Sequence, residues 1–270
     1  MKFVAYKEKK FYYQDIGATQ KPCVLLLHGF GFTHTLWRDW LKHWGDDYRF
    51  LLPDMPGFGK SEFLPALEIS DIAVIMQRIL EEENVAKCTF VGHSMGGYVA
   101  ASFAAQFPKY LQRLVMFHSS FQADDAEKKQ VRQKAIDFMA KNGTKDFFAN
   151  LFKNIFSKDF SENNVDVVSN FCKKAQSFDP ESVIAAYHAM MIRPDLTAVL
   201  PTLTFPVIYL MGEEDTSIPL DRNVKELSNL LFGEALYYKN VAHMAILEKT
   251  EHSAQDLKQV FETTAYLANK

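Results

Sequence analysis

One serine of the sequence stands in a setting that suits nucleophilic catalysis. Ser94 is flanked by Gly92 and Gly96, within the run Val-Gly-His-Ser-Met-Gly-Gly of residues 91–97. A serine on a very sharp turn needs such neighbours, because the chain passes close to itself on both sides and a Cβ would collide there. The turn would leave the Ser94 hydroxyl free to attack a carbonyl carbon. A glycine-rich loop with an ordinary helix-capping serine is the alternative that this pattern alone leaves open.

A serine hydroxyl is a poor nucleophile until a neighbouring base takes its proton, and His243 suits this role best. Imidazole titrates nearest to neutrality among the side chains. His243 comes shortly after the last strand-like run, residues 235–238. His118 ends an earlier strand-like run and is the one serious competitor as the base. We otherwise expect His118 to line the substrate pocket.

An acid must hold the imidazole in the productive tautomer and stabilise the imidazolium that forms. Asp215 follows the apolar run 207–211 and is our candidate for this acid. The neighbouring Glu213 and Glu214 carry the same chemistry and stay open as substitutes. Asp124, which follows the preceding strand-like run, is an alternative from outside this turn.

Two backbone N–H groups are candidates for binding the negative charge that develops on the substrate oxygen. Met95 begins the helix predicted after the serine, where amide groups have no partner within the helix. Phe30 lies in His28-Gly29-Phe30-Gly31, and Gly29 would let the backbone turn its next N–H towards the serine. Phe30 and Met95 are therefore the predicted oxyanion-binding residues.

These residues all follow segments that read as strands of one parallel sheet. Largely apolar, strand-like runs at 24–27, 49–52, 88–91 and 113–117 alternate with helical patterns. Such alternation predicts an α/β fold, with right-handed crossovers and helices on both faces of the sheet. Ligands of open parallel sheets bind beyond the carboxyl ends of the strands, where all the candidate residues fall.

The alternation stops in the third quarter of the chain. Amphipathic helices are predicted at 131–141, 144–156, 162–176 and 180–191, and strand character returns at 207–211. We predict one domain, with a core formed by residues 1–120 and 201–270. Residues 121–200 are predicted to form a helical cap, inserted after the sixth strand as a lid over the strand ends.

The predicted cap is rich in phenylalanine, and most of these side chains would form its own core. Some aromatic and apolar side chains should nevertheless face the serine, and such a pocket favours an uncharged acyl or aryl group. The side chains predicted to line the pocket are those of Phe32, His118, Phe121, Phe148, Tyr187 and Met191.

Composition limits the classes of function. The net charge of −3 gives no electrostatic case for nucleic acid or an anionic membrane as a partner, and no run approaches the length of a membrane span. Three cysteines without paired spacing indicate reduced thiols and no metal site. The N-terminal residues lack the apolar stretch of a signal peptide. We expect a cytoplasmic enzyme without a cofactor, acting on a small molecule as a monomer or homodimer.

Five motifs in order carry a resemblance to the α/β-hydrolase superfamily over nearly the whole chain. They are His28-Gly29-Phe30-Gly31, the run 54–61 from Asp54 to Ser61, Gly92-His93-Ser94-Met95-Gly96-Gly97, Gly212-Glu213-Glu214-Asp215 and Ala242-His243. The order serine, aspartate, histidine is the one found in this superfamily. The helical insert resembles the small-cap branch that holds serine esterases, enol-lactonases and carbon–carbon bond hydrolases. The resemblance implies a mostly parallel sheet of about eight strands. Epoxide hydrolases and haloalkane dehalogenases use aspartate where this chain has Ser94, which argues against both.

The residues and the resemblance together predict a carboxylesterase-like serine hydrolase that forms an acyl-enzyme. Ser94 would be the nucleophile, His243 the base and Asp215 the orienting acid. A carbon–carbon bond or lactone hydrolase of the same fold is the alternative within the enzyme class. A ligand-binding protein on a hydrolase scaffold without activity is the alternative from another class.

Overall fold

A single sheet of eight strands forms the centre of the molecule. The structure, a computed structural model, describes residues 1–268, and its strand order is β1-β2-β4-β3-β5-β6-β7-β8. β1 and β2 are antiparallel to their neighbours, and the remaining pairs are parallel. The predicted mostly parallel sheet is thus confirmed. The strands are β1 Lys2–Tyr6, β2 Lys9–Ile16, β3 Cys23–Leu27, β4 Arg49–Pro53, β5 Cys88–His93, β6 Leu111–Phe117, β7 Val207–Gly212 and β8 Gly233–Tyr238.

The β1–β2 hairpin has a tight turn. Only Lys7 and Glu8 lie between the two strands. Both residues have left-handed backbone angles, with φ values of 47° and 62°. Two consecutive positive φ values match the right-handed twist of the flanking strands, which is why two residues suffice.

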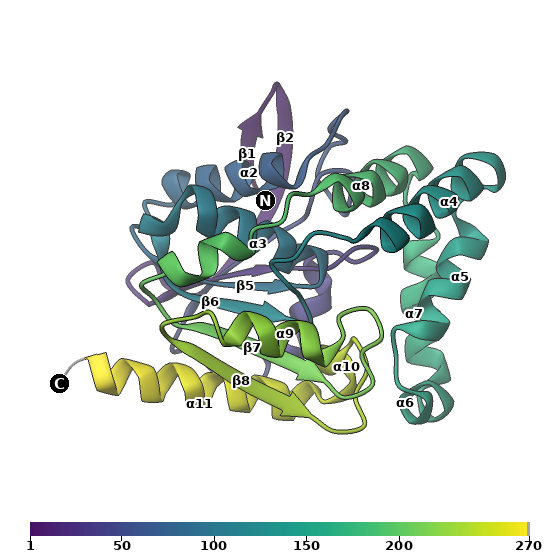
Figure 1. The fold of residues 1–270 in the computed structure, drawn as a ribbon. Helices are drawn as coiled ribbons and strands as arrows, with labels where there is room; N and C mark the ends of the chain where they lie inside the picture. Colours follow the sequence, from purple (N-terminus) through teal and green to yellow (C-terminus); the bar gives the residue numbers. More distant parts are fainter. Residues whose placement is uncertain (269–270) are drawn as a thin grey trace.

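Helices cover both faces of the sheet (Figure 1). The side-chain contacts of β5 and β6 indicate which helix lies on which face. Phe90 of β5 packs on Phe103 of α3. Phe117 of β6 lies on the opposite face of the pleat and packs on Trp37 and Trp40. Strands β3, β4, β5 and β7 are buried along their whole length. The helices outside the cap are α1 Arg38–Leu41, α2 Ile69–Glu82, α3 Met95–Gln106, α9 Leu220–Leu227, α10 Ala245–Glu248 and α11 Thr250–Ala268, with 3-10 turns at His34–Trp37, Pro108–Tyr110 and Thr197–Thr202.

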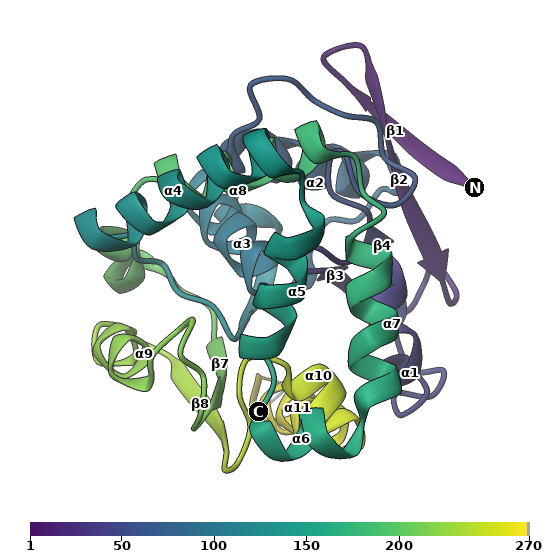
Figure 2. The same ribbon diagram turned by 90° about the vertical axis from the view of Figure 1, so that its right-hand side faces the viewer.

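Five helices follow β6 and precede β7, and they lie together along one side of the molecule (Figures 1 and 2). All fall within residues 121–200, the segment predicted as a cap; its treatment as a separate unit stays a prediction. We call these five the cap helices: α4 Ala126–Asn142, α5 Lys145–Asn154, α6 Lys158–Asn163, α7 Val165–Ala175 and α8 Pro180–Ile192.

One predicted cap helix, residues 162–176, is interrupted in the structure. The chain leaves the helical conformation at Asn164, whose φ and ψ are −132° and 41°. The Asn164 side chain donates to the carbonyl of Phe160. Asparagine readily bonds the nearby backbone in this way and so competes with a continuous helix, which explains the break between α6 and α7.

No helix in the described part of the chain is long and apolar enough to cross a membrane. The three cysteines are free; Cys23 and Cys88 are buried and Cys172 is partly exposed. The thiols of Cys23 and Cys88 stand apart from the polar loops at the carboxyl ends of the strands, because these residues begin β3 and β5.

Candidate active site

Ser94 sits on a strained turn between the end of β5 and the start of α3. Its φ and ψ are 51° and −115°, a conformation that non-glycine residues rarely adopt. A Cβ on Gly92 would lie 2.3 Å from the Gly96 carbonyl oxygen, and one on Gly96 would lie 2.4 Å from that of Leu27. Both positions therefore require glycine, and the turn expected from the sequence is present.

Three polar side chains form a continuous hydrogen-bonded chain that starts at this turn. Ser94 Oγ lies 2.8 Å from Nε2 of His243, and Nδ1 of His243 lies 2.8 Å from Oδ2 of Asp215. Asp215 follows β7, and its Oδ1 accepts from the N–H groups of Ser217 and Ile218 at 2.9 and 3.0 Å. The structure thus brings the predicted nucleophile, base and acid together in the expected sequence of contacts.

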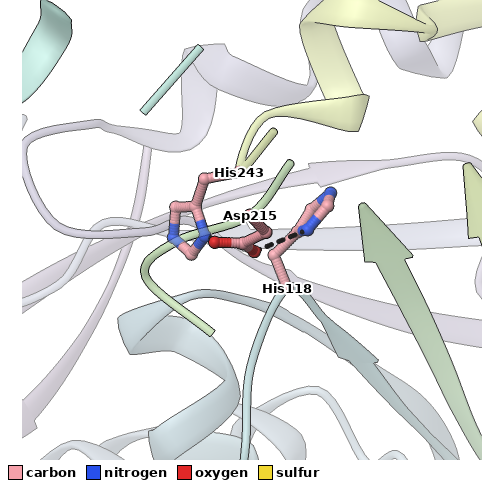
Figure 3. A group of neighbouring side chains, drawn as sticks. All are labelled: His118, Asp215 and His243. Atoms are coloured by element: carbon pink, nitrogen blue, oxygen red, sulfur yellow. Dashed lines mark hydrogen bonds and ion pairs between the residues drawn. The ribbon is translucent and has the colours of Figure 1, made fainter. Parts of the chain in front are cut away.

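A second histidine bonds the same carboxylate, as Figure 3 shows. Nδ1 of His118 lies 3.0 Å from Oδ2 of Asp215, while Nε2 accepts the N–H of Ala245 at 3.2 Å. Because Nε2 accepts, the proton of the neutral ring lies on Nδ1 and is donated to Asp215. Burial lowers the pKa of His118 in spite of the adjacent carboxylate. His118 has a φ of 50°, so strained backbone directs this side chain at the acid.

The electrostatic environment keeps Asp215 ionised. Burial by itself would raise the pKa of Asp215, but His243 and His118 outweigh burial and hold this pKa well below its ordinary value. The alternative acids lie elsewhere. Glu213 and Glu214 are exposed, and Asp124 forms ion pairs with two arginines.

Both predicted oxyanion donors are placed beside the serine. The N–H groups of Phe30 and Met95 have no hydrogen-bond partner among the described residues. A Cβ on Gly29 would lie 3.2 Å from Cβ of Ser94, so the loop that carries Phe30 passes directly against the serine. Met95 is the first residue of α3, where the helix dipole adds to the attraction for a negative oxygen.

His93 has a role in the geometry that sequence reasoning did not assign. Its Nε2 donates to the carbonyl oxygen of His243 at 3.1 Å, which fixes the backbone of the proposed base. Its Nδ1 is buried without a hydrogen-bond partner and faces Gly29. Burial holds the pKa of His93 well below its ordinary value, with His243 and His118 acting in the same direction.

A cavity of about 190 Å³ opens beside Ser94 and His243. Two residues predicted to line it, Phe32 and Tyr187, do so, and Phe30 joins them. The cap helices contribute one wall and the strand-end loops contribute the other. The residues around the cavity are Phe30, Phe32, His93, Ser94, Tyr98, Lys128, Val131, Arg132, Leu151, Ile155, Tyr187, Met190, Thr216, Ser217 and His243.

Two predicted pocket residues are buried behind this lining instead. His118 is buried and lies outside the cavity lining, where its ring bonds Oδ2 of Asp215, the same oxygen that His243 bonds. Phe148 stacks on Phe30 with ring centroids 5.7 Å apart, so it supports the wall without forming it.

The remaining two predicted pocket residues lie outside this cavity. Met191 lines a separate hollow with Lys129, Gln130, Gln133 and Ile192. Phe121 follows β6, its N–H is held by the carboxylate of Glu226, and its side chain is buried outside the cavity lining. The prediction of these pocket positions is corrected accordingly.

The cap helices are bonded to the loops that carry the site. The N–H of His243 donates to the carbonyl of Ile155 at 3.0 Å, directly after α5. Nζ of Lys128 on α4 donates to the carbonyl of Ser217 at 2.8 Å, two residues beyond Asp215. The proposed base and the proposed acid are therefore each positioned in part by the cap.

One group of described residues has the composition of a metal site: His118, Asp215 and His243 offer ligand atoms within 4.8 Å of one another. These atoms already bond each other through Oδ2 of Asp215. A metal would take Nδ1 of His243 away from the acid that orients it. We therefore interpret the group as a hydrogen-bonded acid–base arrangement.

The fold and this site define a hydrolase of α/β architecture with a serine at the strand-to-helix turn. The chain belongs to the α/β-hydrolase family, because the family model described as "alpha/beta hydrolase fold" matches residues 22–250. The family predicted from the five sequence motifs is thereby confirmed.

Known proteins of this family are similar over most of their length. A pimeloyl-[acyl-carrier protein] methyl ester esterase of Vibrio vulnificus is 26% identical over 244 residues, 88% of this chain and 93% of that protein. The structure of a thermophilic esterase from Thermogutta terrifontis has a TM-score of 0.90 at 24% identity, covering 97% of this chain and 99% of that one. The enol-lactonase of Burkholderia xenovorans LB400 has a TM-score of 0.89 at 16% identity, covering 97% and 100%. The two structural likenesses show the shared fold.

Proposed function

We propose that the protein is a serine hydrolase that cleaves small carboxylic esters through an acyl-enzyme intermediate. The observation that carries this proposal is the unbroken contact from Ser94 Oγ through the His243 ring to Asp215, with 2.8 Å at each step. The named activity of the Vibrio vulnificus relative, a methyl ester esterase, supports the same reaction class.

The geometry suits each step of the reaction. Ser94 Oγ attacks the ester carbonyl while Nε2 of His243 accepts its proton, and Asp215 stabilises the imidazolium. The N–H groups of Phe30 and Met95 then bind the carbonyl oxygen as it becomes negative. His243 returns the proton to the departing alcohol oxygen, which leaves the acyl group on Ser94. Water, deprotonated by His243, releases the carboxylic acid and restores the serine.

The acid–base arrangement needs no further group for these steps. Ser94 supplies the nucleophile, His243 moves the proton at Nε2, and two backbone amides hold the negative oxygen. We therefore propose catalysis without a metal or an organic cofactor, on a small-molecule substrate that enters the cavity beside Ser94.

The test is the variant Ser94→Ala, assayed with p-nitrophenyl acetate and butyrate. We expect turnover to fall by roughly four to six orders of magnitude, because the nucleophile acts as a unit with His243 and Asp215. Melting temperature and circular dichroism check that the variant is folded. A folded Ser94→Ala protein with near-normal activity would contradict the proposal.

A fluorophosphonate probe separates catalysis from ligand binding on an inactive scaffold. Such a probe should label Ser94 covalently, because it phosphonylates only a serine activated by a base. Ser102→Ala is the matched control: Ser102 lies on the same helix, α3, and its hydroxyl bonds Gln106. Labelling should survive in Ser102→Ala and vanish in Ser94→Ala.

A further inference from the structure

The cavity beside Ser94 carries two cationic side chains on a wall that is otherwise mostly apolar and aromatic. Lys128 and Arg132 stand four residues apart on α4, so they share one face of that helix. No aspartate or glutamate is among the described residues that line the cavity. The sequence had suggested a pocket for an uncharged group, so these cations need an explanation.

The cations are only partly neutralised by the protein. The side chain of Asp124, which is completely buried, accepts from Nε of Arg132 and lies 3.0 Å from Nη2 of Arg193. Nζ of Lys128 donates to the uncharged carbonyl of Ser217. Two arginines thus share one carboxylate, and Lys128 has no ion pair among the described residues.

A buried excess of positive charge is unfavourable unless an anion completes the site. Arg132 is only 7% exposed, and a cation removed from water without a partner loses much of its solvation. Burial lowers the pKa of Lys128, and the neighbouring cations Arg132 and Arg222 act in the same direction. Asp124 and Tyr98 act against this lowering but do not cancel it.

The available donors can still serve a ligand. The hydrogen bond of Arg132 to a carboxylate uses Nε, and no other bond from its guanidinium group to a carboxylate occurs among the described residues. The ammonium of Lys128 has three protons, one of which is directed at Ser217. A guanidinium edge and an ammonium group together match the two oxygens of a carboxylate.

We propose that the cavity binds esters that carry a free carboxylate on the acyl chain, as in a monoester of a short dicarboxylic acid. Lys128 and Arg132 pair with the carboxylate while Ser94 attacks the ester carbonyl. This substrate class rests on the proposed serine-hydrolase function. Hydrolysis of a monomethyl ester consumes one water, releases methanol and leaves the dicarboxylate.

The size of the cavity limits the length of the acyl chain. Its volume of about 190 Å³ lies below the roughly 300–1,000 Å³ of sites for drug-sized ligands. The apolar lining of the cavity includes Leu151, Ile155 and Tyr187, which suits a few methylene groups. Monomethyl glutarate, with three methylenes, is therefore a suitable probe.

The first experiment compares kcat/KM for monomethyl glutarate with that for methyl 5-methylhexanoate. The second ester has the same chain but carries an uncharged isopropyl group in place of the carboxylate. Charge-assisted hydrogen bonds are worth about 1.5–3 kcal/mol, so we expect a preference of roughly ten- to a hundredfold for the charged ester. If the wild type hydrolyses the neutral ester and the ratio of kcat/KM, charged ester over neutral ester, is one or less, the carboxylate site is overturned. The proposed serine-hydrolase function would not be affected by that result.

Two variants and a control locate the preference in the structure. Lys128→Met and Arg132→Gln should each reduce the charged-to-neutral ratio by about tenfold. Lys134→Met removes an exposed lysine from the same helix and should leave the ratio unchanged. If Arg132→Gln does not fold because Asp124 loses its partner, Lys128→Met still decides, since it leaves both ion pairs of Asp124 in place. Unaltered ratios in folded Lys128→Met protein would overturn the proposal.

A binding measurement separates failure of the site from failure of the chemistry. Calorimetric titration of Ser94→Ala protein with monomethyl glutarate should give binding that weakens about tenfold when Lys128→Met is added. If the wild type hydrolyses neither ester, the proposed function is contradicted, and the titration alone judges the carboxylate site. Absence of binding in Ser94→Ala protein would then overturn that site as well.

Discussion

Asp215 receives four hydrogen bonds, and two of them come from histidines. Its Oδ1 accepts two backbone N–H groups, and its Oδ2 accepts from both His243 and His118. Each donor stabilises the negative charge, so the charge is shared between the proposed base, His243, and a histidine that does not touch Ser94. His118 is therefore a positioning residue for Asp215 in the proposed mechanism, acting through the acid.

Removal of the His118 ring should change both the rate and its dependence on pH. In His118→Ala, Asp215 loses one donor and interacts more strongly with the remaining histidine. We expect kcat for a small ester to fall by roughly tenfold, because a hydrogen bond to a charged group is lost and Asp215 is held less firmly. The acid limb of the kcat/KM profile should move to higher pH. Initial rates of ester hydrolysis, measured for both proteins from pH 5 to 9, give kcat and the pH dependence of kcat/KM.

His118→Asn is the rescue variant for this prediction. Asparagine places an N–H donor near the position of Nδ1 and tolerates the φ of 50° at this residue. It should therefore retain most of the rate and the wild-type pH profile. Equal profiles for His118→Ala and wild type would reduce His118 to a packing role.

At the scale of residues, the sequence is sufficient where a local motif fixes the backbone. The glycines around Ser94 and the strand-ending turns before Asp215 and His243 are local, so these three positions could be predicted. The bonds of His93 and His118 were missed, because they join ends of different strands. Contacts between side chains at the ends of different strands depend on the register and twist of the sheet. No single segment of the sequence determines these two properties.

At the scale of elements, the turn between β5 and α3 depends on the absence of side chains. Added atoms at Gly92 and Gly97 would meet backbone or Ser119 within 2.3 Å. Strand β5 and helix α3 are both buried, so the surroundings have little freedom to shift. Gly143, which follows α4, has a φ of 79° but open space around it, because no atom lies within 4 Å of the position that a Cβ would take.

Gly92→Ala should therefore destabilise the protein more than Gly143→Ala. At Gly143 the cost is conformational alone, about 1–3 kcal/mol, because its φ of 79° and ψ of −178° lie in a region that almost only glycine adopts. At Gly92 the methyl group meets backbone atoms of a packed turn, and we expect failure to fold or a loss above about 3 kcal/mol. Urea unfolding followed by circular dichroism gives both values. Similar losses for the two variants would contradict the close packing described for the turn.

The predictability of elements follows the strength of their patterns. Strands buried on both faces appear as continuous apolar runs, and the expected strands of the sheet core were found. The cap helices were predicted to exist, but their rotation about their own axes was not. On α8, Met191 was expected to face the pocket and Met190 does so instead. Helix α4 is polar on most of its surface, so nothing in its pattern marked Lys128 and Arg132 as inward-facing.

At the scale of the whole molecule, buried carboxylates make stability depend on pH. Burial acts to raise the pKa values of Asp54, Asp124 and Asp215, but adjacent histidines or arginines outweigh burial and lower all three. A carboxyl group whose pKa is lower in the folded state stabilises the fold above its unfolded pKa, about 3.9. That contribution is lost as the pH falls through the folded pKa. Glu226 has the opposite sign, because burial raises its pKa.

The free energy of unfolding should consequently fall as the pH is lowered from about 5 to below 3. Three carboxyl groups with lowered pKa values outnumber Glu226, whose pKa is raised. The free energy of unfolding should therefore decrease overall as the pH falls. Urea titrations at a series of pH values measure this slope. Asp124→Asn should be less stable at pH 7 and show a shallower acid slope. A protein that becomes more stable on acidification over this range would be inconsistent with these ionised, buried carboxylates.

The hydrogen bond from the His243 N–H to the Ile155 carbonyl has a consequence for protein engineering. In this chain the segment after α5 is a support of the histidine loop, and Lys128 on α4 similarly supports the loop after Asp215. A transplanted cap that lacks these two anchoring points would alter the rate of the chemical step along with the choice of substrate. In a hybrid protein, exchange points that keep Ile155 and Lys128 together with the sheet would retain both hydrogen bonds to the loops that carry His243 and Asp215.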